Sequence, residues 1–350
     1  MKMYFFPGRR RLHSAGSEIR VSGVPIKVGS TMRYLGIVLD SRWRFVEHFR
    51  RLAPRLVGVA GALGSLLPNL RGARGGCRRL YTGVIRSMAL YGAPIWADAL
   101  SARNRPFLRR PQRVMALRVV RAYRTVSFEA ACVMAGTPPW ELDAEMLADV
   151  YRRVSASKLL GLNPSYEEVE QWRDEAVERR FREWERRLEE PSAGERTVAA
   201  IRPVLREWCD RRHGAITFRL TQVLSGHGCF GRYLCKVARR EPSMACHWCA
   251  CPEDTADHTL AVCPAWAEPR ARLVAVVGSD LSLPSIVRAM VGSDRSWRAV
   301  ITFSEDVISR KEEAERVRER DPHADPIRRR RPIGRRRRVA ADLRGRNQPP

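Results

Sequence analysis

Four residues in the last third of the chain have the types and the spacing of a metal site. Cys246 and Cys249 are separated by two residues, so one tight turn can direct both thiolates at the same ion. His258 follows after eight more residues and Cys263 after a further four. This set completes the tetrahedron that Zn²⁺ prefers and leaves no open position for a reacting molecule. The pattern predicts a structural zinc knuckle whose metal supplies much of the local folding free energy.

Neighbouring side chains offer alternatives to this ligand set. Cys251 could replace Cys249 at a less usual spacing, and further candidates are His227, Cys229, Cys235 and His247. Two aromatic residues flank the knuckle, Trp248 and Trp266, and could either stack on a nucleic-acid base or pack as a minimal core. Nine unevenly placed cysteines without a secretory signal favour metal binding in a reducing compartment over a disulfide framework.

The charge of the chain favours a polyanionic partner. Lys and Arg number 64 against 38 Asp and Glu, which gives a net charge of +26, and only five of the 64 are lysine. Guanidinium groups hold phosphates with two hydrogen bonds and stack on bases, although codon bias in a GC-rich gene would also enrich arginine. The weakly apolar run 56–68 contains three glycines and ends on proline, so it cannot span a bilayer. We expect a soluble, intracellular protein that binds RNA or DNA and no membrane.

The elements that must position these residues are mainly helical, with a small β portion at the N-terminus. Short strands are expected at 19–21 and 25–28, and one buried strand at 34–40. From residue 44 onward helical periodicity takes over. One predicted helix carries Leu80, Val84, Met88 and Tyr91 on a single apolar face, and another carries Val177, Phe181, Trp184 and Leu188. The pattern 127–135 indicates another helix.

The C-terminal third continues this helical pattern and then changes in composition. Short helices are expected at 273–277, 286–290 and 297–308. Beyond residue 321, two blocks of four arginines lie in a context with almost no apolar residues, which predicts a disordered basic tail. Such a tail could serve nuclear import, bind phosphates, or be inert.

Several motifs together resemble a known family. The segment 220–234, which contains Gly226-His227-Gly228-Cys229-Phe230, precedes the knuckle with its Asp254-Thr255-Ala256-Asp257-His258. This combination resembles the C-terminal region of non-LTR retrotransposon polyproteins, most closely the R1-type elements of arthropods. Upstream, Tyr34-Leu35-Gly36-Ile37-Val38-Leu39-Asp40 is similar to the primer-grip block of their reverse transcriptase, and 80–84 and 90–96 are similar to its thumb. The segment 278–305 is similar to the region after the knuckle.

The resemblance implies a domain plan. Residues 1–40 would be the edge of a reverse transcriptase palm, 41–135 a helical thumb and 136–240 a helical linker. The zinc knuckle would occupy 241–270, a helical segment 271–320, and the disordered tail 321–350.

The same resemblance implies roles for individual residues. Tyr34, Leu35 and Gly36 would bear on the primer terminus. The arginines before Tyr81, namely Arg71, Arg74, Arg78 and Arg79, would follow the template–primer backbone. The remaining candidates for nucleic-acid contact are Trp248, Arg328, Arg329, Arg335 and Arg336.

The sequence lacks the residues with which such a polymerase catalyses phosphoryl transfer. A polymerase of this family holds two Mg²⁺ ions with a pair of adjacent aspartates and a third carboxylate, and this chain contains no Asp-Asp dipeptide. Mg²⁺ would therefore belong only to the full-length parent. We expect a truncated, non-catalytic fragment that holds template RNA, primer or target DNA during target-primed reverse transcription, in the nucleus after import from the cytoplasm. The alternatives are a protein–protein adaptor, half of a split polymerase, and a degenerate remnant without a cellular role.

Overall fold

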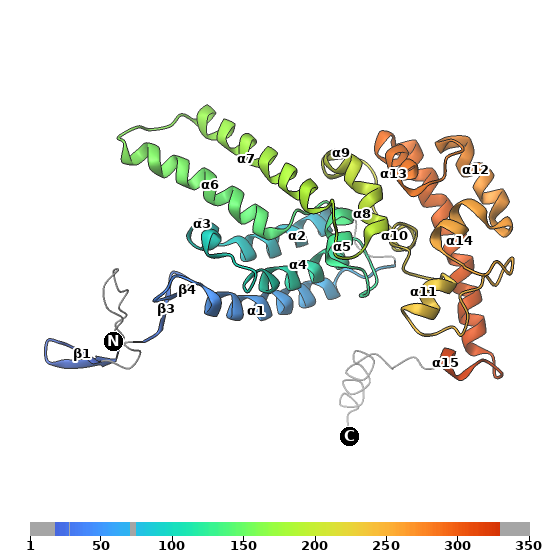
Figure 1. Ribbon diagram of the computed structural model, residues 1–350, viewed down its shortest axis with the longest axis horizontal. Helices are drawn as coiled ribbons and strands as arrows, with labels where there is room; N and C mark the ends of the chain where they lie inside the picture. The colour runs from blue at the N-terminus through green and yellow to red at the C-terminus, as the bar shows by residue number, and fades with distance from the viewer. Residues whose placement is uncertain (1–17, 28, 71–74, 330–350) are drawn as a thin grey trace, which may run out of the picture. The chain divides into compact units, whose positions relative to one another are not determined.

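The computed structural model describes residues 18–27, 29–70 and 75–329, and it is mainly helical, as predicted (Figure 1). The chain divides into two compact units, 1–215 and 216–350. The boundary between the two units falls within the predicted linker 136–240. Among the described residues, no helix has both the length and the apolar character needed to cross a membrane.

Unit 1 begins with two antiparallel hairpins. Strands β1 (Glu18–Val21) and β2 (Val24–Lys27) confirm the first predicted pair, and their turn at Ser22-Gly23 has positive φ at both residues. The expected single strand at 34–40 is wrong. Strand β3 (Thr31–Tyr34) ends, Leu35 and Gly36 turn with φ of 45° and 86°, and β4 (Ile37–Asp40) returns. Two successive residues with positive φ are the preferred connection of a two-residue hairpin. The turn was not predicted because the apolar residues of 34–40 are continuous around one glycine.

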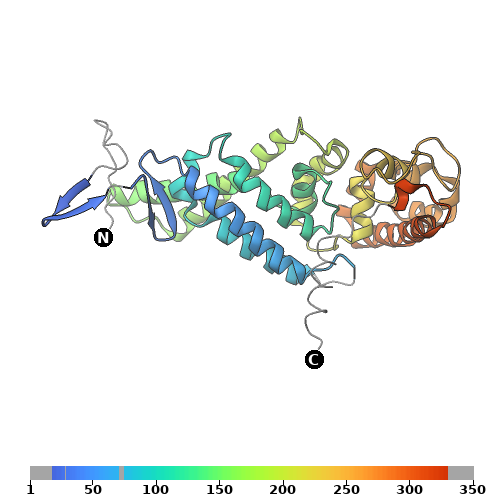
Figure 2. The same cartoon turned by 90° about the horizontal axis from the view of Figure 1, so that it is seen from below.

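The second hairpin leads directly into the first helix (Figure 2), and a carboxylate bonds the backbone between them. Oδ2 of Asp40 accepts hydrogen bonds from the backbone N–H groups of Arg44 and Phe45, at 3.1 and 2.6 Å. The helix α1 (Val46–Ser65) begins immediately afterwards. The side chain of Asp40 thus satisfies backbone donors that the turn leaves without partners, and it fixes the direction in which α1 starts.

The core of unit 1 lies between α1, α2 (Gly75–Leu90), α4 (Arg105–Val119) and α6 (Trp140–Leu159), with the short α3 (Ala93–Trp96) beside them. Phe49 and Trp96 meet edge to face in this core, with ring centroids 5.2 Å apart. The remaining elements of unit 1 are η1 (Ala97–Ala99), α5 (Phe128–Ala135), α7 (Tyr166–Arg187), α8 (Glu195–Ile201), η2 (Arg202–Val204) and α9 (Leu205–Asp210).

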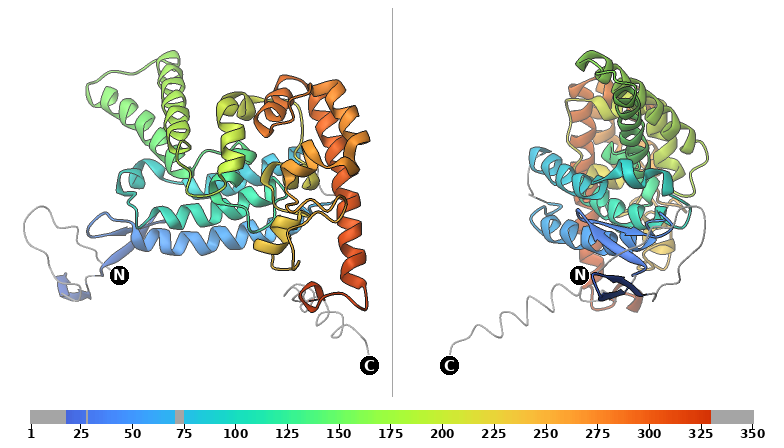
Figure 3. Two further views of the ribbon diagram at one scale, coloured as in Figure 1. Left: turned by 45° about the vertical axis from the view of Figure 1, so that its right-hand side comes forward. Right: turned by 90° about the vertical axis from the view of Figure 1, so that its left-hand side faces the viewer.

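Two of the predicted helices of unit 1 agree with the structure and one differs in its buried face. Ser127 caps α5, and Ser165 forms a capping box with Glu168 at the start of α7. Helix α7 packs on α6, and the two helices spread apart toward the loop that joins them (Figure 3). Helix α2 is present, but its predicted apolar face is wrong. Leu80 is 70% exposed, whereas Tyr81 and Ile85 are buried.

Unit 2 is built around one long helix, α14 (Asp294–Arg320), which packs on α10 (Phe218–Ser225), α12 (Ala267–Val277) and α13 (Leu283–Gly292). The three helices expected after the knuckle are therefore confirmed, although the last is not short. The shorter elements are α11 (Gly231–Lys236), η3 (His258–Val262), η4 (Pro264–Trp266) and α15 (Pro326–Arg329).

The start of the expected disordered tail differs from the prediction. Residues 321–329 form a turn and α15, which packs on α14, and Arg328 pairs with Glu241 at 2.7 Å. A buried carboxylate attracts this arginine, and composition alone does not reveal such a partner. The rest of the predicted tail lies outside the described residues.

Candidate metal centre and nucleic-acid residues

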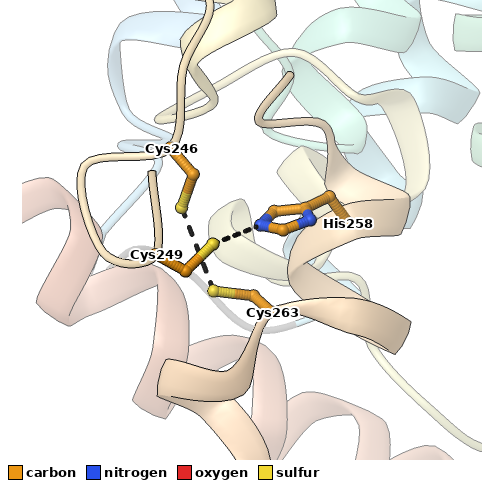
Figure 4. A group of neighbouring side chains, drawn as sticks. All are labelled: Cys246, Cys249, His258 and Cys263. Carbon is orange, nitrogen blue, oxygen red and sulfur yellow. Dashed lines mark hydrogen bonds between the residues drawn. The ribbon is translucent and has the colours of Figure 1, made fainter. Parts of the chain in front are cut away.

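The four predicted ligands converge on one point (Figure 4). One ligand atom from each of Cys246, Cys249, His258 and Cys263 lies within 4.8 Å of all the others. The Sγ atoms of Cys246 and Cys263 are 3.9 Å apart, and Sγ of Cys249 is 3.3 Å from Nε2 of His258. A tetrahedral zinc ion with Zn–S bonds of about 2.3 Å requires an S–S edge of about 3.8 Å. The donor set and its dimensions fit a tetrahedral metal ion.

A tight backbone turn positions the first two ligands. The N–H of Ala250 donates to the carbonyl oxygen of Cys246 at 2.9 Å, and the N–H of Cys246 donates to that of Cys251 at 2.8 Å. Ala250 takes a left-handed conformation with φ of 57°. This turn brings Cys249 back beside Cys246, whereas Sγ of Cys251 lies 3.9 Å from the carbonyl oxygen of Glu253 and outside the cluster.

A π-helical turn positions the second two ligands. Element η3 starts at His258, and the N–H of Cys263 donates to the carbonyl oxygen of His258 at 2.8 Å. Arg270, on α12, donates to the carbonyl oxygens of Leu260 and Cys263 at 2.9 and 2.6 Å. These bonds satisfy acceptors that the wide turn exposes, so α12 holds the ligand-bearing turn in shape.

Burial is the main cause of the pKa shifts of three of the four predicted ligands, Cys246, His258 and Cys263. It raises the pKa of Cys263 to about 12 and also raises the pKa of Cys246. Backbone N–H groups directed at the two sulfur atoms oppose this rise only in part. Burial lowers the pKa of His258, which favours the neutral imidazole that a metal requires. A divalent cation among these groups would offset the cost of forming buried thiolates.

The other cysteines and histidines near the knuckle have different environments. Nε2 of His247 is 3.5 Å from a carboxylate oxygen of Glu241, and the ring of His227 lies against Tyr233. Cys229 is buried next to Gln222, and Sγ of Cys235 is 3.9 Å from the carbonyl oxygen of Pro242. The geometry therefore favours the predicted ligand set over its alternatives.

The two tryptophans of the knuckle have different exposures. Trp266 is 1% exposed and Trp248 is 43% exposed, and their ring centroids are 4.7 Å apart. Trp266 belongs to the core of unit 2. Trp248 packs on it with one part of its ring and leaves another part accessible to a partner.

The residues of the predicted primer grip are exposed at the turn between β3 and β4. Tyr34 and Leu35 are 58% and 71% exposed. The hydroxyl of Tyr91 donates to the carbonyl oxygen of Leu35 at 2.9 Å, and Gly36 lies against the ring of Tyr91. The bond from Tyr91 fixes the turn against the end of α2, so both side chains face outward.

The predicted arginines divide into several groups. Arg79 is exposed, whereas Arg78 is buried. The guanidinium of Arg78 donates to the carbonyl oxygens of Arg118 and Pro68, the latter at 2.9 Å, so it stabilises the end of α4. Arg328 is partly buried on Glu241, and the backbone of Arg329 lies in α15. Arg71, Arg74, Arg335 and Arg336 lie outside the described residues.

Three residues of unit 2 matter to the site and were not predicted. Asp254 and Lys311 form a buried ion pair, and Gly231 lies against the backbone that precedes Cys246. A sequence signal did exist for Lys311, since lysine is rare in this chain. Its partner, Asp254, lies 57 residues earlier in the chain. Residue spacing cannot show that two residues so far apart in sequence form a pair.

Comparison with known proteins finds relatives over most of the chain. The chain is 30% identical over 265 residues to a putative 115 kDa protein in the type-1 retrotransposable element R1DM of Drosophila melanogaster. It is 27% identical over 308 residues to a Pol polyprotein from element R1 4 of Nasonia vitripennis, and 28% identical over 266 residues to one from element R1 of Bradysia coprophila. The chain is a homologue of the Pol polyproteins of R1-type retrotransposons, as the resemblance predicted.

The matches cover different shares of the aligned proteins. The match to the Drosophila protein includes 72% of this chain and 25% of that protein. The corresponding shares are 82% and 74% for the Nasonia protein, and 72% and 26% for the Bradysia protein. The chain thus spans about a quarter of two of these relatives. No family model and no solved structure matches the chain.

Proposed function

We propose that the chain binds RNA or DNA through the helices of unit 1, and that a zinc ion held by the four ligands stabilises unit 2. In this proposal the protein is a non-catalytic part of an R1-type reverse transcription system. It holds template RNA, primer or target DNA during target-primed reverse transcription, and it acts in the nucleus. The relatives support this role because their names describe retrotransposon Pol polyproteins.

The uneven distribution of charge carries the proposal. Residues 41–140 contain 18 arginines and only three acidic residues, whereas 141–215 contain 14 basic and 17 acidic residues. In the second segment many arginines pair with carboxylates, such as Arg180 with Asp143 and Arg153 with Glu175. In the first segment arginines outnumber the acidic residues several-fold. A concentrated positive charge of this kind attracts the phosphate backbone of a nucleic acid.

The structure places several of these arginines on neighbouring helices. Arg55 on α1, Arg79 on α2 and Arg110 on α4 are all exposed, and these three helices pack on one another. Guanidinium groups on one bundle can contact successive phosphates of the same strand. The exposed turn with Tyr34 and Leu35, and the exposed part of Trp248, are further candidates for contact with bases.

The proposal is tested by binding of the full chain to labelled single-stranded RNA and to duplex DNA at a series of salt concentrations. We expect the logarithm of the association constant to fall linearly with the logarithm of salt, with a slope of about −0.7 per contacted phosphate for single strands and about −0.9 for duplex. Absence of binding at low salt would reject the proposal and favour an adaptor or a degenerate remnant.

A further inference from the structure

A buried ion pair lies next to the metal ligands in unit 2. Nζ of Lys311, on α14, is 2.8 Å from both carboxylate oxygens of Asp254, and both side chains are almost fully buried. Asp254 belongs to the loop between Cys249 and His258. The pair therefore connects the longest helix of the unit to the ligand loop.

The surroundings of this pair supply further hydrogen bonds. The hydroxyl of Thr259 donates to Oδ1 of Asp254 at 3.2 Å and accepts from Nζ of Lys311 at 3.1 Å. The N–H of Gly231 donates to Oδ2 of Asp254 at 3.0 Å. The ring of Phe230 lies 5.4 Å from the ammonium group and covers it. A buried charge pair stabilises a fold only when its remaining donors and acceptors are bonded in this way.

The backbone of Asp254 extends these connections to the segment before the knuckle. Its N–H donates to the carbonyl oxygen of Met244 at 2.8 Å, two residues before Cys246, and its own carbonyl oxygen accepts from the N–H of Arg232 at 3.0 Å. Thr259 directly follows His258. One aspartate thus joins the segments that carry the first and the third metal ligands.

We propose that Lys311 and Asp254 are positioning residues for the metal centre, which hold Cys246 and His258 in ligating geometry, so that α14 is part of the metal site. This inference rests on the ligand set of the proposed function. Loss of the ammonium would leave a carboxylate buried without its counter-charge, and the loop would have to shift to hydrate it. Because the loop carries the ligands, the shift would weaken metal binding.

The test measures Co²⁺ binding to the full chain, followed by competition with Zn²⁺. Co²⁺ in a tetrahedral thiolate site has characteristic visible absorption, which reports the geometry as well as the affinity. We expect Lys311→Met to weaken Co²⁺ binding by about 10- to 100-fold, the usual effect of removing an outer-shell partner, and to alter the spectrum. Lys311→Arg should restore part of the affinity.

The matched control is the adjacent residue on the same helix. The carboxylate of Glu312 is also buried, but it bonds Gln222 and Arg219, away from the ligand loop. We expect Glu312→Gln to change the affinity by less than about threefold, since it removes no partner of the ligand loop. Where Lys311→Met does not fold, Asp254→Asn replaces it, because the amide oxygen can still accept from the N–H of Gly231 and the amide NH₂ can donate to the hydroxyl of Thr259.

Three results would contradict this inference. Wild-type affinity and spectrum in Lys311→Met would show that the pair does not position the ligands. Equal weakening in Lys311→Met and Glu312→Gln would show a general loss of stability. Absence of Co²⁺ binding by the wild-type chain would reject the ligand set itself, and with it the metal part of the proposed function.

Discussion

At the scale of the residue, Cys249 and Cys251 differ because a backbone turn separates two thiols that are close in sequence. The left-handed Ala250 directs Cys249 toward Cys246 and directs Cys251 toward the carbonyl of Glu253. Only the first of these thiols can therefore share an ion with His258 and Cys263.

We predict that Cys249→Ser lowers the zinc content of the purified protein, and that Cys251→Ser leaves it at the wild-type value. Loss of one thiolate removes a quarter of the coordination shell, whereas the thiol of Cys251 lies outside the cluster. Elemental analysis of the two variants measures this difference. Equal zinc content in both would mean that the ligand set is wrong.

A second prediction concerns Gly231, at the start of α11. A Cβ atom at this position would lie 2.5 Å from the carbonyl oxygen of Met244, and backbone atoms cannot move aside easily. Gly231→Ala should therefore destabilise unit 2 by about 1–3 kcal/mol. The control is Gly292→Ala on α13, where nothing lies within 4 Å of the added atom. Urea denaturation of the metal-loaded variants compares their free energies of unfolding. Equal stability of Gly231→Ala and Gly292→Ala would contradict the close packing at Gly231.

The cluster of Cys246, Cys249, His258 and Cys263 could be predicted from the sequence because its residue spacing depends on local turns. The environment of Arg78 could not be predicted from the sequence. Its partners are carbonyl groups at Pro68 and Arg118, and no pattern of side-chain types reveals backbone acceptors. A cluster of arginines therefore predicted phosphate contacts throughout, although one of its members stabilises the protein itself.

At the scale of the element, α2 shows why apolar periodicity can predict a helix and still miss its buried face. The sequence presents two apolar stripes, one with Leu80 and Val84 and the other with Tyr81 and Ile85. Packing against α1, α4 and α6 selects the second stripe. Both stripes have helical spacing, so only the tertiary contacts decide which is buried.

We predict that Ile85→Ala destabilises unit 1 by about 2–5 kcal/mol, because it opens a cavity in the core. Leu80→Ala should change the stability by less than about 0.5 kcal/mol, because that side chain is largely solvated already. Chemical denaturation, monitored by tryptophan fluorescence, measures the stability of both variants. A larger effect of Leu80→Ala would support the face first predicted from the sequence.

The hairpin β3–β4 shows that an apolar pattern can also predict strands and still miss the turn between them. An unbroken apolar run with one glycine predicts a single strand, yet Leu35 and Gly36 both take positive φ and reverse the chain. Leucine is uncommon in that conformation, so the turn had no sequence signal beyond Gly36. The bond from the hydroxyl of Tyr91 helps to hold it.

At the scale of the whole molecule, the chain divides at residue 215 into two units of different character. Unit 1 carries most of the surplus of positive charge, and unit 2 carries the cluster of Cys246, Cys249, His258 and Cys263. The boundary between the units lies within the predicted linker 136–240, and Trp140 near the start of that linker belongs to the core of unit 1. The division depends on long-range contacts that composition does not record.

This division predicts separate responses to metal removal. A strong chelator should increase the rate of amide hydrogen exchange in unit 2, because the ion contributes to the stability of that unit, and should leave unit 1 unchanged. Mass spectrometry of peptides from each unit measures the effect. A variant with both Cys249→Ser and His258→Ala should not respond to the chelator. Equal acceleration in both units would contradict the division.

We propose that nucleic acid binds to the arginine-rich segment 41–140. The most direct test of this proposal compares two triple variants in salt-dependent binding to RNA and to duplex DNA. One variant replaces Arg55, Arg79 and Arg110 with glutamine, and the control replaces Arg173, Arg182 and Arg212, which are also exposed but lie in the charge-balanced segment. We predict that the first variant lowers the salt slope by about one for each phosphate that it no longer binds, and that the control keeps the wild-type slope. An equal decrease of affinity in both variants would contradict the claim.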